Sequence, residues 1–265
     1  MRCAVGPQFR AAGYVEGILT QHRMHQHYQN IRSWLNNNFA NKTVPPAFET
    51  WFQAQDKWLR SQAKAHPTDE RWQGMLRIVT QLDGIVEGYN EQAPEDEKLS
   101  LYDWQLIQAT GDIFDLIPTI VKSQAPDWER MPLHEVMDVV RANSHCSGLI
   151  RVTGDMSDLF MSHVAWFNYG SMLRIFKSYD FDVASPGRRT AFSSYPGLLS
   201  SLDDFYMNSP SQLGMVQTTN NVFNKDLYKL VKPESLFAWQ RVRGANLLAN
   251  TGEEWVEVIR ADNSG

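Results

Sequence analysis

The spacing of hydrophobic residues changes near residue 140, and this change limits the fold more than any single motif does. Before that point apolar side chains recur every three or four residues, as in amphipathic helices. Two stripes show this repeat: Phe48, Trp51, Phe52, Trp58 and Leu59, then Trp72, Leu76, Val79, Leu82, Ile85 and Val86. After that point, short apolar runs are separated by turn formers, as in strands. The sequence therefore predicts an α+β fold in which a mainly helical region, residues 1–145, precedes a mixed region, residues 146–265.

The same patterns predict individual elements. Leu101–Val121 is mostly apolar and predicts one helix that bends near Pro118. Three short runs predict strands: Ser147–Thr153, Asp158–His163 and Gly214–Thr219. Gly154 and Asp155 would supply the turn of a hairpin between the first two runs. Tyr169–Phe176 has helical spacing instead.

Composition and charge exclude several classes of protein. The chain has 265 residues, 43% of them hydrophobic, which is enough for a sizeable core. A net charge of -5 without a cluster of Lys and Arg argues against nucleic-acid binding. No apolar run reaches the roughly 18 to 20 residues of a membrane span, and Met1–Pro7 lacks the apolar segment of a secretory signal. Two cysteines, Cys3 and Cys146, are too few for a disulfide framework, and Asn41 begins an Asn-Lys-Thr glycosylation sequon.

Cys146 is the strongest candidate for chemistry. It stands between small polar residues and an apolar run, so its thiol would lie at the start of a strand where a carbonyl group can approach. His163, at the end of the next expected strand, would return towards Cys146 in a hairpin and lower the pKa of its thiol. The alternative interpretations are an inert buried cysteine and a hydrogen-bonded core histidine.

Three further groups carry weaker signals. Asn220 and Asn221 could donate hydrogen bonds to an oxyanion, or simply cap a turn. Asp203 and Asp204 are adjacent, so their side chains diverge, and they are interpreted as a solvated helix start. His22–His27 contains three histidines but no cysteine or carboxylate at a spacing that completes a metal site, so no metal and no cofactor are predicted.

Seven blocks of sequence together resemble the phospholipase B-like (lamina ancestor-like) family. Their order and spacing extend over nearly the whole chain, which is more specific than any single motif. The blocks are Ala11–Thr20, His145–Ile150, Ser171–Ile175, Ser194–Gly197, Leu202–Tyr206, Thr218–Asn224 and Trp239–Asn246.

The resemblance implies an N-terminal nucleophile hydrolase with an αββα sandwich. Such a precursor cleaves itself before a cysteine, here between His145 and Cys146. The freed α-amino group, with an ordinary pKa of about 8, can then accept the thiol proton. His163 matches the family's histidine, in a segment usually His-Asp-Thr-Trp but here containing Val164 and Ala165, which removes two polar groups. The implied substrates are fatty-acyl esters of glycerophospholipids, in secreted or lysosomal compartments.

The resemblance also implies that this chain is a fragment. Family precursors begin with a secretory signal and continue well beyond Gly265 into further strands, so the 265 residues alone are expected to fold poorly or to associate. Three alternatives stay open: a non-catalytic relative that binds lipid or protein, an amidase of the same fold, and a hydrolase with a Cys146–His163 pair that does not cleave itself. The sequence carries no signal for oligomeric state.

Overall fold

The computed structural model describes residues 5–143, 146–202, 205–220 and 222–264. Its α-helices are α1 (Val5–Asn37), α2 (Pro46–Ala65), α3 (Glu70–Gln92), α4 (Leu101–Gln108), α5 (Ile113–Ile120), α6 (Leu133–Asn143), α7 (Ala238–Leu248) and α8 (Gly252–Arg260). Its strands are β1 (Ser147–Val152), β2 (Leu159–Val164), β3 (Ile175–Asp180), β4 (Arg189–Ser194), β5 (Phe205–Ser209) and β6 (Leu213–Val216). Short 3-10 turns lie at Glu95–Glu97, Lys122–Gln124, Tyr169–Ser171 and Leu227–Leu230. Helices and strands thus mix as an α+β fold, which confirms the predicted class.

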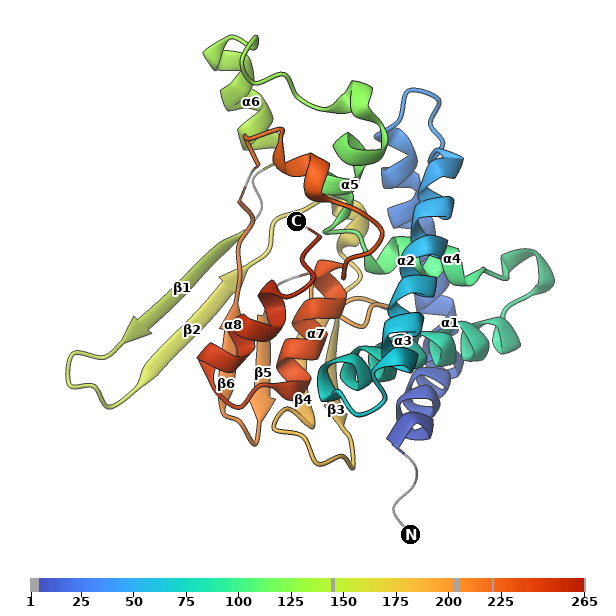
Figure 1. Cartoon of the computed structure of the whole chain (residues 1–265), viewed down its shortest axis with the longest axis vertical. Coiled ribbons are helices and arrows are strands. Elements are labelled where there is room, and N and C mark those ends of the chain that lie inside the picture. Colours follow the sequence, from blue (N-terminus) through green and yellow to red (C-terminus); the bar gives the residue numbers. More distant parts are fainter. Residues whose placement is uncertain (1–4, 144–145, 203–204, 221, 265) are drawn as a thin grey trace.

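Helices α1 to α4 gather on one side of the molecule, and the hairpin of β1 and β2 projects from the other (Figure 1). Both predicted apolar stripes, on α2 and α3, face the largest hydrophobic core. Phe48, Phe52 and Leu59 are buried there, as are Val79 and Ile85. The 3.6-residue repeat read from the sequence is therefore the core-facing side of each helix.

Glycines let α1 and α3 touch through their backbones. A Cβ atom on Gly84 would lie 2.1 Å from the carbonyl oxygen of Arg10, and one on Gly88 would lie 2.1 Å from that of Tyr14. Gly13 and Gly17 of α1 make the same kind of approach to α3. Since residues four apart share a helix face, the two glycine pairs form one continuous contact line.

The strands form two antiparallel sheets. Strands β1 and β2 pair as a two-stranded sheet, with Gly148 opposite His163, which confirms the predicted hairpin. Strands β3 to β6 form a second sheet in sequential order. Helix α7 packs on this second sheet, where the Asn208 side chain donates to Oδ1 of Asn246 at 3.2 Å.

The structure corrects two expectations about elements. Leu101–Val121 is not one helix bent at Pro118, because α4 ends at Gln108 and α5 begins at Ile113, with Pro118 inside α5. Tyr169–Phe176 is not helical, since only a short 3-10 turn forms there before β3 starts at Ile175. Strands β3, β4 and β5 were not predicted. The expected helix start at residues 203–204 lies outside the described residues.

Candidate active site

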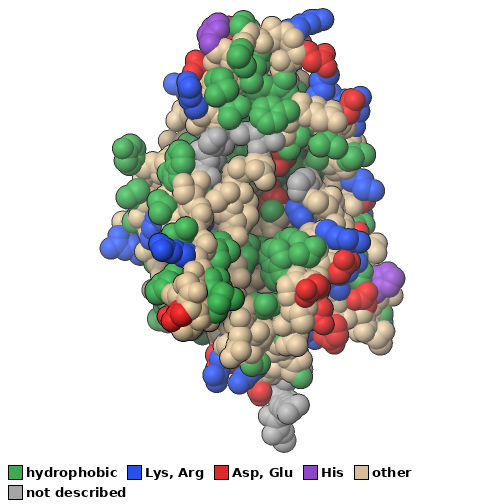
Figure 2. Space-filling model, turned by 90° about the vertical axis from the view of Figure 1, so that its left-hand side faces the viewer, with side chains coloured by type: hydrophobic (Ala, Val, Ile, Leu, Met, Phe, Trp, Pro, Cys, Tyr) green, Lys and Arg blue, Asp and Glu red, His purple; other side chains and the backbone are tan. Residues whose placement is uncertain are grey.

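A cavity of about 690 Å³ lies where α5, α7 and α8 meet the chain around Cys146. Figure 2 shows a hollow on this face of the molecule, bordered by hydrophobic side chains and with acidic side chains inside it. The lining also includes residues 165–167 and 200–202 and several residues between 215 and 220. Its volume lies in the usual range of small-molecule sites.

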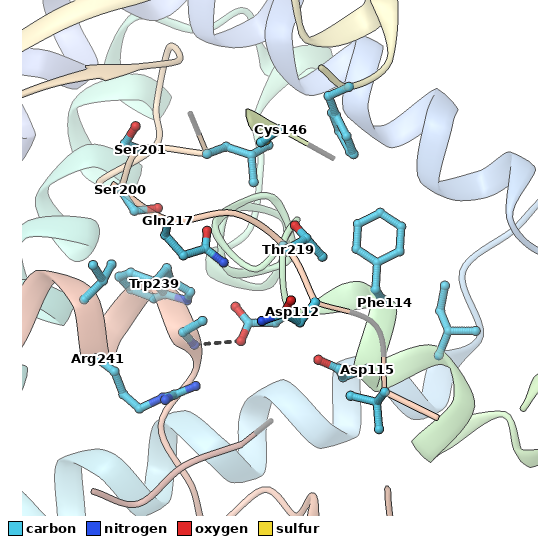
Figure 3. A pocket seen from close by; sticks show the side chains of 18 of the residues that line it. Asp112, Phe114, Asp115, Cys146, Ser200, Ser201, Gln217, Thr219, Trp239 and Arg241 are labelled. Atoms are coloured by element: carbon cyan, nitrogen blue, oxygen red, sulfur yellow. Dashed lines mark hydrogen bonds between the residues drawn. The ribbon is translucent and has the colours of Figure 1, made fainter. Parts of the chain in front are cut away.

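Cys146 lines this cavity and has an unusual backbone. Its φ angle is +82°, a left-handed conformation that side chains other than glycine seldom adopt. Holding a residue there costs on the order of 1–3 kcal/mol, and such outliers concentrate at functional sites. The half-buried Cys146 directly precedes β1, so the strand fixes the position of its thiol at the cavity wall (Figure 3).

The other site residues predicted from the sequence lie in different places. Asn220 is exposed and lines the cavity together with Thr219. His163 is a described residue on β2 opposite Gly148, but it is not among the residues that line the cavity. His145 and Asn221 lie outside the described residues.

One wall of the cavity comes from a buried segment between β4 and β5. Residues 195–201 are all buried, although the segment has no regular secondary structure. Gln108 of α4 holds it in both directions, because its Nε2 donates to the carbonyl of Gly197 at 2.6 Å and its Oε1 accepts from the amide of Leu199 at 2.8 Å. Such partners make it possible to bury an irregular backbone.

Further side chains fix the end of this segment that faces the cavity. Ser194 donates to the carbonyl of Ser200 at 2.7 Å, and the amide of Ser201 donates to the hydroxyl oxygen of Tyr206. The Ser200 side chain is directed towards the cavity in Figure 3. Ser200 and Ser201 therefore occupy a wall that is rigidly held from three elements.

Asp112, Asp115 and Arg241 form a charged floor. Oδ1 of Asp112 accepts a hydrogen bond from the amide of Ala238 at 2.7 Å (Figure 3). Burial raises the pKa of Asp112 to about 6, although that hydrogen bond and Arg241 oppose the shift. Burial also raises the pKa of Asp115, and it lowers the pKa of Arg241.

Aromatic side chains make up much of the remaining lining. Phe114 and Phe167 line the cavity and pack edge-on around Trp34, with ring centroids 5.9 and 5.0 Å from it. Trp128, which also lines the cavity, packs against Phe223 at 5.3 Å. The cavity thus combines a charged floor with apolar walls, so it can accept a molecule that has both polar and apolar parts.

No described residues form a group of three or more His, Cys, Asp or Glu side chains able to hold a metal ion. Of the three histidines in 22–27, His27 is buried and stacks on Tyr195, and Nδ1 of His25 lies 2.9 Å from the hydroxyl of Tyr89. None of the described helices has both the length and the hydrophobicity needed to cross a bilayer.

Sequence reasoning missed the floor of the cavity. Asp112 is one of three acidic residues in the mostly apolar stretch Leu101–Val121. It stands beside Gly111, and this local signal also marks the break between α4 and α5. Arg241 and Ser200 had no such signal, because their role depends on contacts with distant parts of the chain.

Comparison with known proteins places the chain in a family. The family model for phospholipase B matches residues 3–265. Phospholipase B from Crotalus adamanteus is 40% identical over 265 residues, which cover 96% of this chain and 46% of that protein. Phospholipase B-like 1 from Rattus norvegicus is 38% identical over 259 residues, covering 96% of this chain and 45% of that protein. Phospholipase B-like protein B from Dictyostelium discoideum is 38% identical over 263 residues, covering 97% of this chain and 45% of that protein.

The fold and the cavity define an α+β protein with a site of mixed polarity. The chain belongs to the phospholipase B family. It spans less than half the length of the curated relatives it matches. The resemblance read from the seven sequence blocks is thereby confirmed.

Proposed function

We propose that this chain is the nucleophile-bearing part of a phospholipase B-like hydrolase that cleaves itself between His145 and Cys146 and then hydrolyses fatty-acyl esters of glycerophospholipids. The observation that carries the proposal is Cys146, held at φ +82° on the wall of the cavity in a member of the phospholipase B family. Backbone strain at the residue that follows the scissile bond favours cleavage, because breaking the bond releases the constraint.

Self-cleavage would proceed through the thiol of Cys146. Its sulfur attacks the carbonyl carbon of His145, the carbon–nitrogen bond breaks, and the α-amino nitrogen of Cys146 takes up the thiol proton. Water then hydrolyses the thioester, which leaves the His145 carboxylate and a chain that begins at Cys146. The new α-amino group, with an ordinary pKa of about 8, can act as a base at neutral pH.

Ester hydrolysis would use the same thiol and amine. The amine takes the thiol proton, the thiolate attacks the ester carbonyl, and the leaving alcohol receives that proton, so an acyl-thioester remains. Water, deprotonated by the amine, then releases the fatty acid and restores the thiol. Asn220 and Asn221 are proposed donors to the oxyanion, and His163 a proposed partner that orients the site through the hairpin.

The proposal includes the N-terminal nucleophile fold and its two regions. Residues 146–265 would begin the αββα catalytic part, and residues 1–145 would be the mainly helical region that cleavage makes a separate chain. A secreted or lysosomal location agrees with the exposed sequon at Asn41, which lies in the turn region after α1 and would carry a glycan.

Lipid hydrolysis tests the activity. Fatty-acid release from mixed micelles should follow appearance of the processed form, and Cys146→Ala should abolish both. Cys146→Ser keeps a nucleophile of similar size and should retain a small residual rate. Processing without ester hydrolysis, but with hydrolysis of an acyl amide, would replace the phospholipase by the amidase alternative. If processing and hydrolysis are both absent, the non-catalytic relative gains support.

A further inference from the structure

The charges in the cavity do not balance. Among the described residues that line it, Asp112 and Asp115 are acidic and Arg241 is basic. Nε and Nη1 of Arg241 donate to the carbonyls of Leu236 and Ile259, at 3.1 and 2.7 Å. Two of the nitrogens of Arg241 thus donate to backbone carbonyls. Two carboxylates then face a cavity with one cation, and the excess negative charge favours a positively charged ligand.

Asp115 is the carboxylate most available to such a ligand. Within the described residues it makes no side-chain hydrogen bond and no salt bridge, although it lines the cavity and senses the charge of Arg241. Asp112 keeps one oxygen on the amide of Ala238. Its second oxygen adds acceptor capacity on the same floor.

Ser200 supplies a second, independent sign of a ligand. Its residue surface is only 6% exposed, so it is more than nine-tenths buried. Its hydroxyl has no hydrogen-bond partner within the part of the chain that the structure describes, and Figure 3 shows it directed into the cavity. The hydroxyl therefore opens onto the cavity, where it can donate a hydrogen bond to a ligand oxygen.

Aromatic rings border the acidic floor. Trp239 lies in the first turn of α7, Trp255 lies on α8, and Tyr228 lies in the 3-10 turn before α7. All three line the cavity. A cationic nitrogen near aromatic faces is attracted by the negative potential of the rings. Rings and carboxylates together are the surroundings that recognise substituted ammonium groups.

We infer that the floor of the cavity binds the cationic nitrogen of a zwitterionic phospholipid headgroup, with Asp115 and Asp112 on the ammonium and Ser200 on a phosphate or ester oxygen. This inference rests on the proposed function, because it places the headgroup of the same substrate in the same cavity as Cys146. It adds specificity: choline and ethanolamine lipids are preferred over lipids that carry the same phosphate without a cation.

Equilibrium binding tests this inference without turnover. In the Cys146→Ala background, calorimetric titration compares dihexanoyl phosphatidylcholine with dihexanoyl phosphatidylglycerol, which has the same chains and phosphate. We expect the choline lipid to bind about tenfold more tightly, a difference of about 1.4 kcal/mol. Asp115→Asn should remove most of that preference, and Ser200→Ala should weaken both lipids alike. Asp138 is an exposed carboxylate on α6, so Asp138→Asn is the matched control and should change the affinity for neither lipid.

The outcomes separate the inference from the proposed function. Equal affinity for both lipids would overturn headgroup recognition and leave the phospholipase proposal standing. A choline preference that survives Asp115→Asn would overturn the assignment to this floor. If neither of the two lipids nor glycerophosphocholine binds, both proposals fail. Glycerophosphocholine is titrated as a third ligand. If it binds while the two lipids do not, the cation site is supported and a lipid substrate is contradicted.

Discussion

Asp112 and Ala238 are 126 residues apart in sequence but are joined by a 2.7 Å hydrogen bond from the Ala238 amide to the Asp112 carboxylate. Asp112 precedes α5 and Ala238 begins α7, so the bond ties two helix starts together under the cavity. A carboxylate at the N-terminus of α7 also complements the helix dipole.

The raised pKa of Asp112 predicts a pH dependence of stability. Its pKa is about 6 in the folded chain, against an ordinary value near 4, so between these values the folded state binds more protons than the unfolded state. The contribution of Asp112 to the free energy of unfolding should therefore rise as pH falls from 7 to 4. Urea unfolding at pH 7, 6 and 5 should show the free energy of unfolding changing with pH in this direction, and Asp112→Asn should reduce the slope. A slope unchanged by the substitution would contradict the assignment.

The glycine contact between α1 and α3 predicts a large effect from a small substitution. Gly88→Ala would place a methyl carbon 2.1 Å from the carbonyl oxygen of Tyr14, which forces the helices apart. We expect a loss of about 1–3 kcal/mol, even though alanine is the better helix former. Gly6→Ala is the control, because nothing lies within 4 Å of its added Cβ on α1. Thermal unfolding should show a lower melting temperature for Gly88→Ala and an unchanged or higher one for Gly6→Ala.

A buried ion pair fixes the sheet to α1. Lys177 of β3 donates to Glu16 of α1 and to the carbonyl of Leu198, and the hydroxyl of Tyr179 donates to the same carboxylate at 2.8 Å. Burial lowers the pKa of Lys177, and Glu16 opposes that shift. The pair therefore also supports the segment that forms the cavity wall.

Breaking this pair should be costly. Glu16→Gln leaves the Lys177 charge buried without its counterion, and we expect a loss of about 3–5 kcal/mol. Glu87→Gln removes an exposed pair with Arg10 at 2.8 Å and should cost less than about 1 kcal/mol. Chemical denaturation of both variants supplies the comparison. Equal losses would mean that Lys177 is not buried as described.

The projecting hairpin predicts association. By the register of β1 and β2, Leu149, Phe160 and Val164 share one face, and each is at least 57% exposed. An exposed apolar face on an isolated two-stranded sheet tends to acquire a partner. Sedimentation velocity measures this directly: the chain should associate at micromolar concentration, and Phe160→Lys should shift it towards monomer. Leu19→Lys, on an exposed position of α1, should not. A monomer at all concentrations would contradict this expectation.

Local patterns predicted the parts of the fold that depend on local spacing. The stripes on α2 and α3 and the hairpin of β1 and β2 follow from residue periodicity alone. The break before α5 was not predicted, because apolar residues recur on both sides of it within Leu101–Val121. Pro118 looked like the stronger breaker, yet it is tolerated inside α5.

The candidate site was predictable only in part, because only some of its features depend on local sequence. Cys146 was found because a thiol before a strand is a local signal, and the structure places it on the cavity wall. Its positive φ angle is not encoded in its residue type, since cysteine has no preference for that conformation. The hydrogen-bond partners of Asp112 and Ser200 come from other elements of the fold, so no local sequence pattern predicts these contacts.

The most direct test of the central claim is the N-terminal sequence and intact mass of the chain after incubation at mildly acidic pH, beside Cys146→Ala. Self-processing predicts a new piece that begins Cys-Ser-Gly, whose mass matches residues 146–265, and its absence in the alanine variant. If the unsubstituted chain stays intact under conditions in which it is folded, no free amine forms at Cys146 and the N-terminal nucleophile mechanism is contradicted.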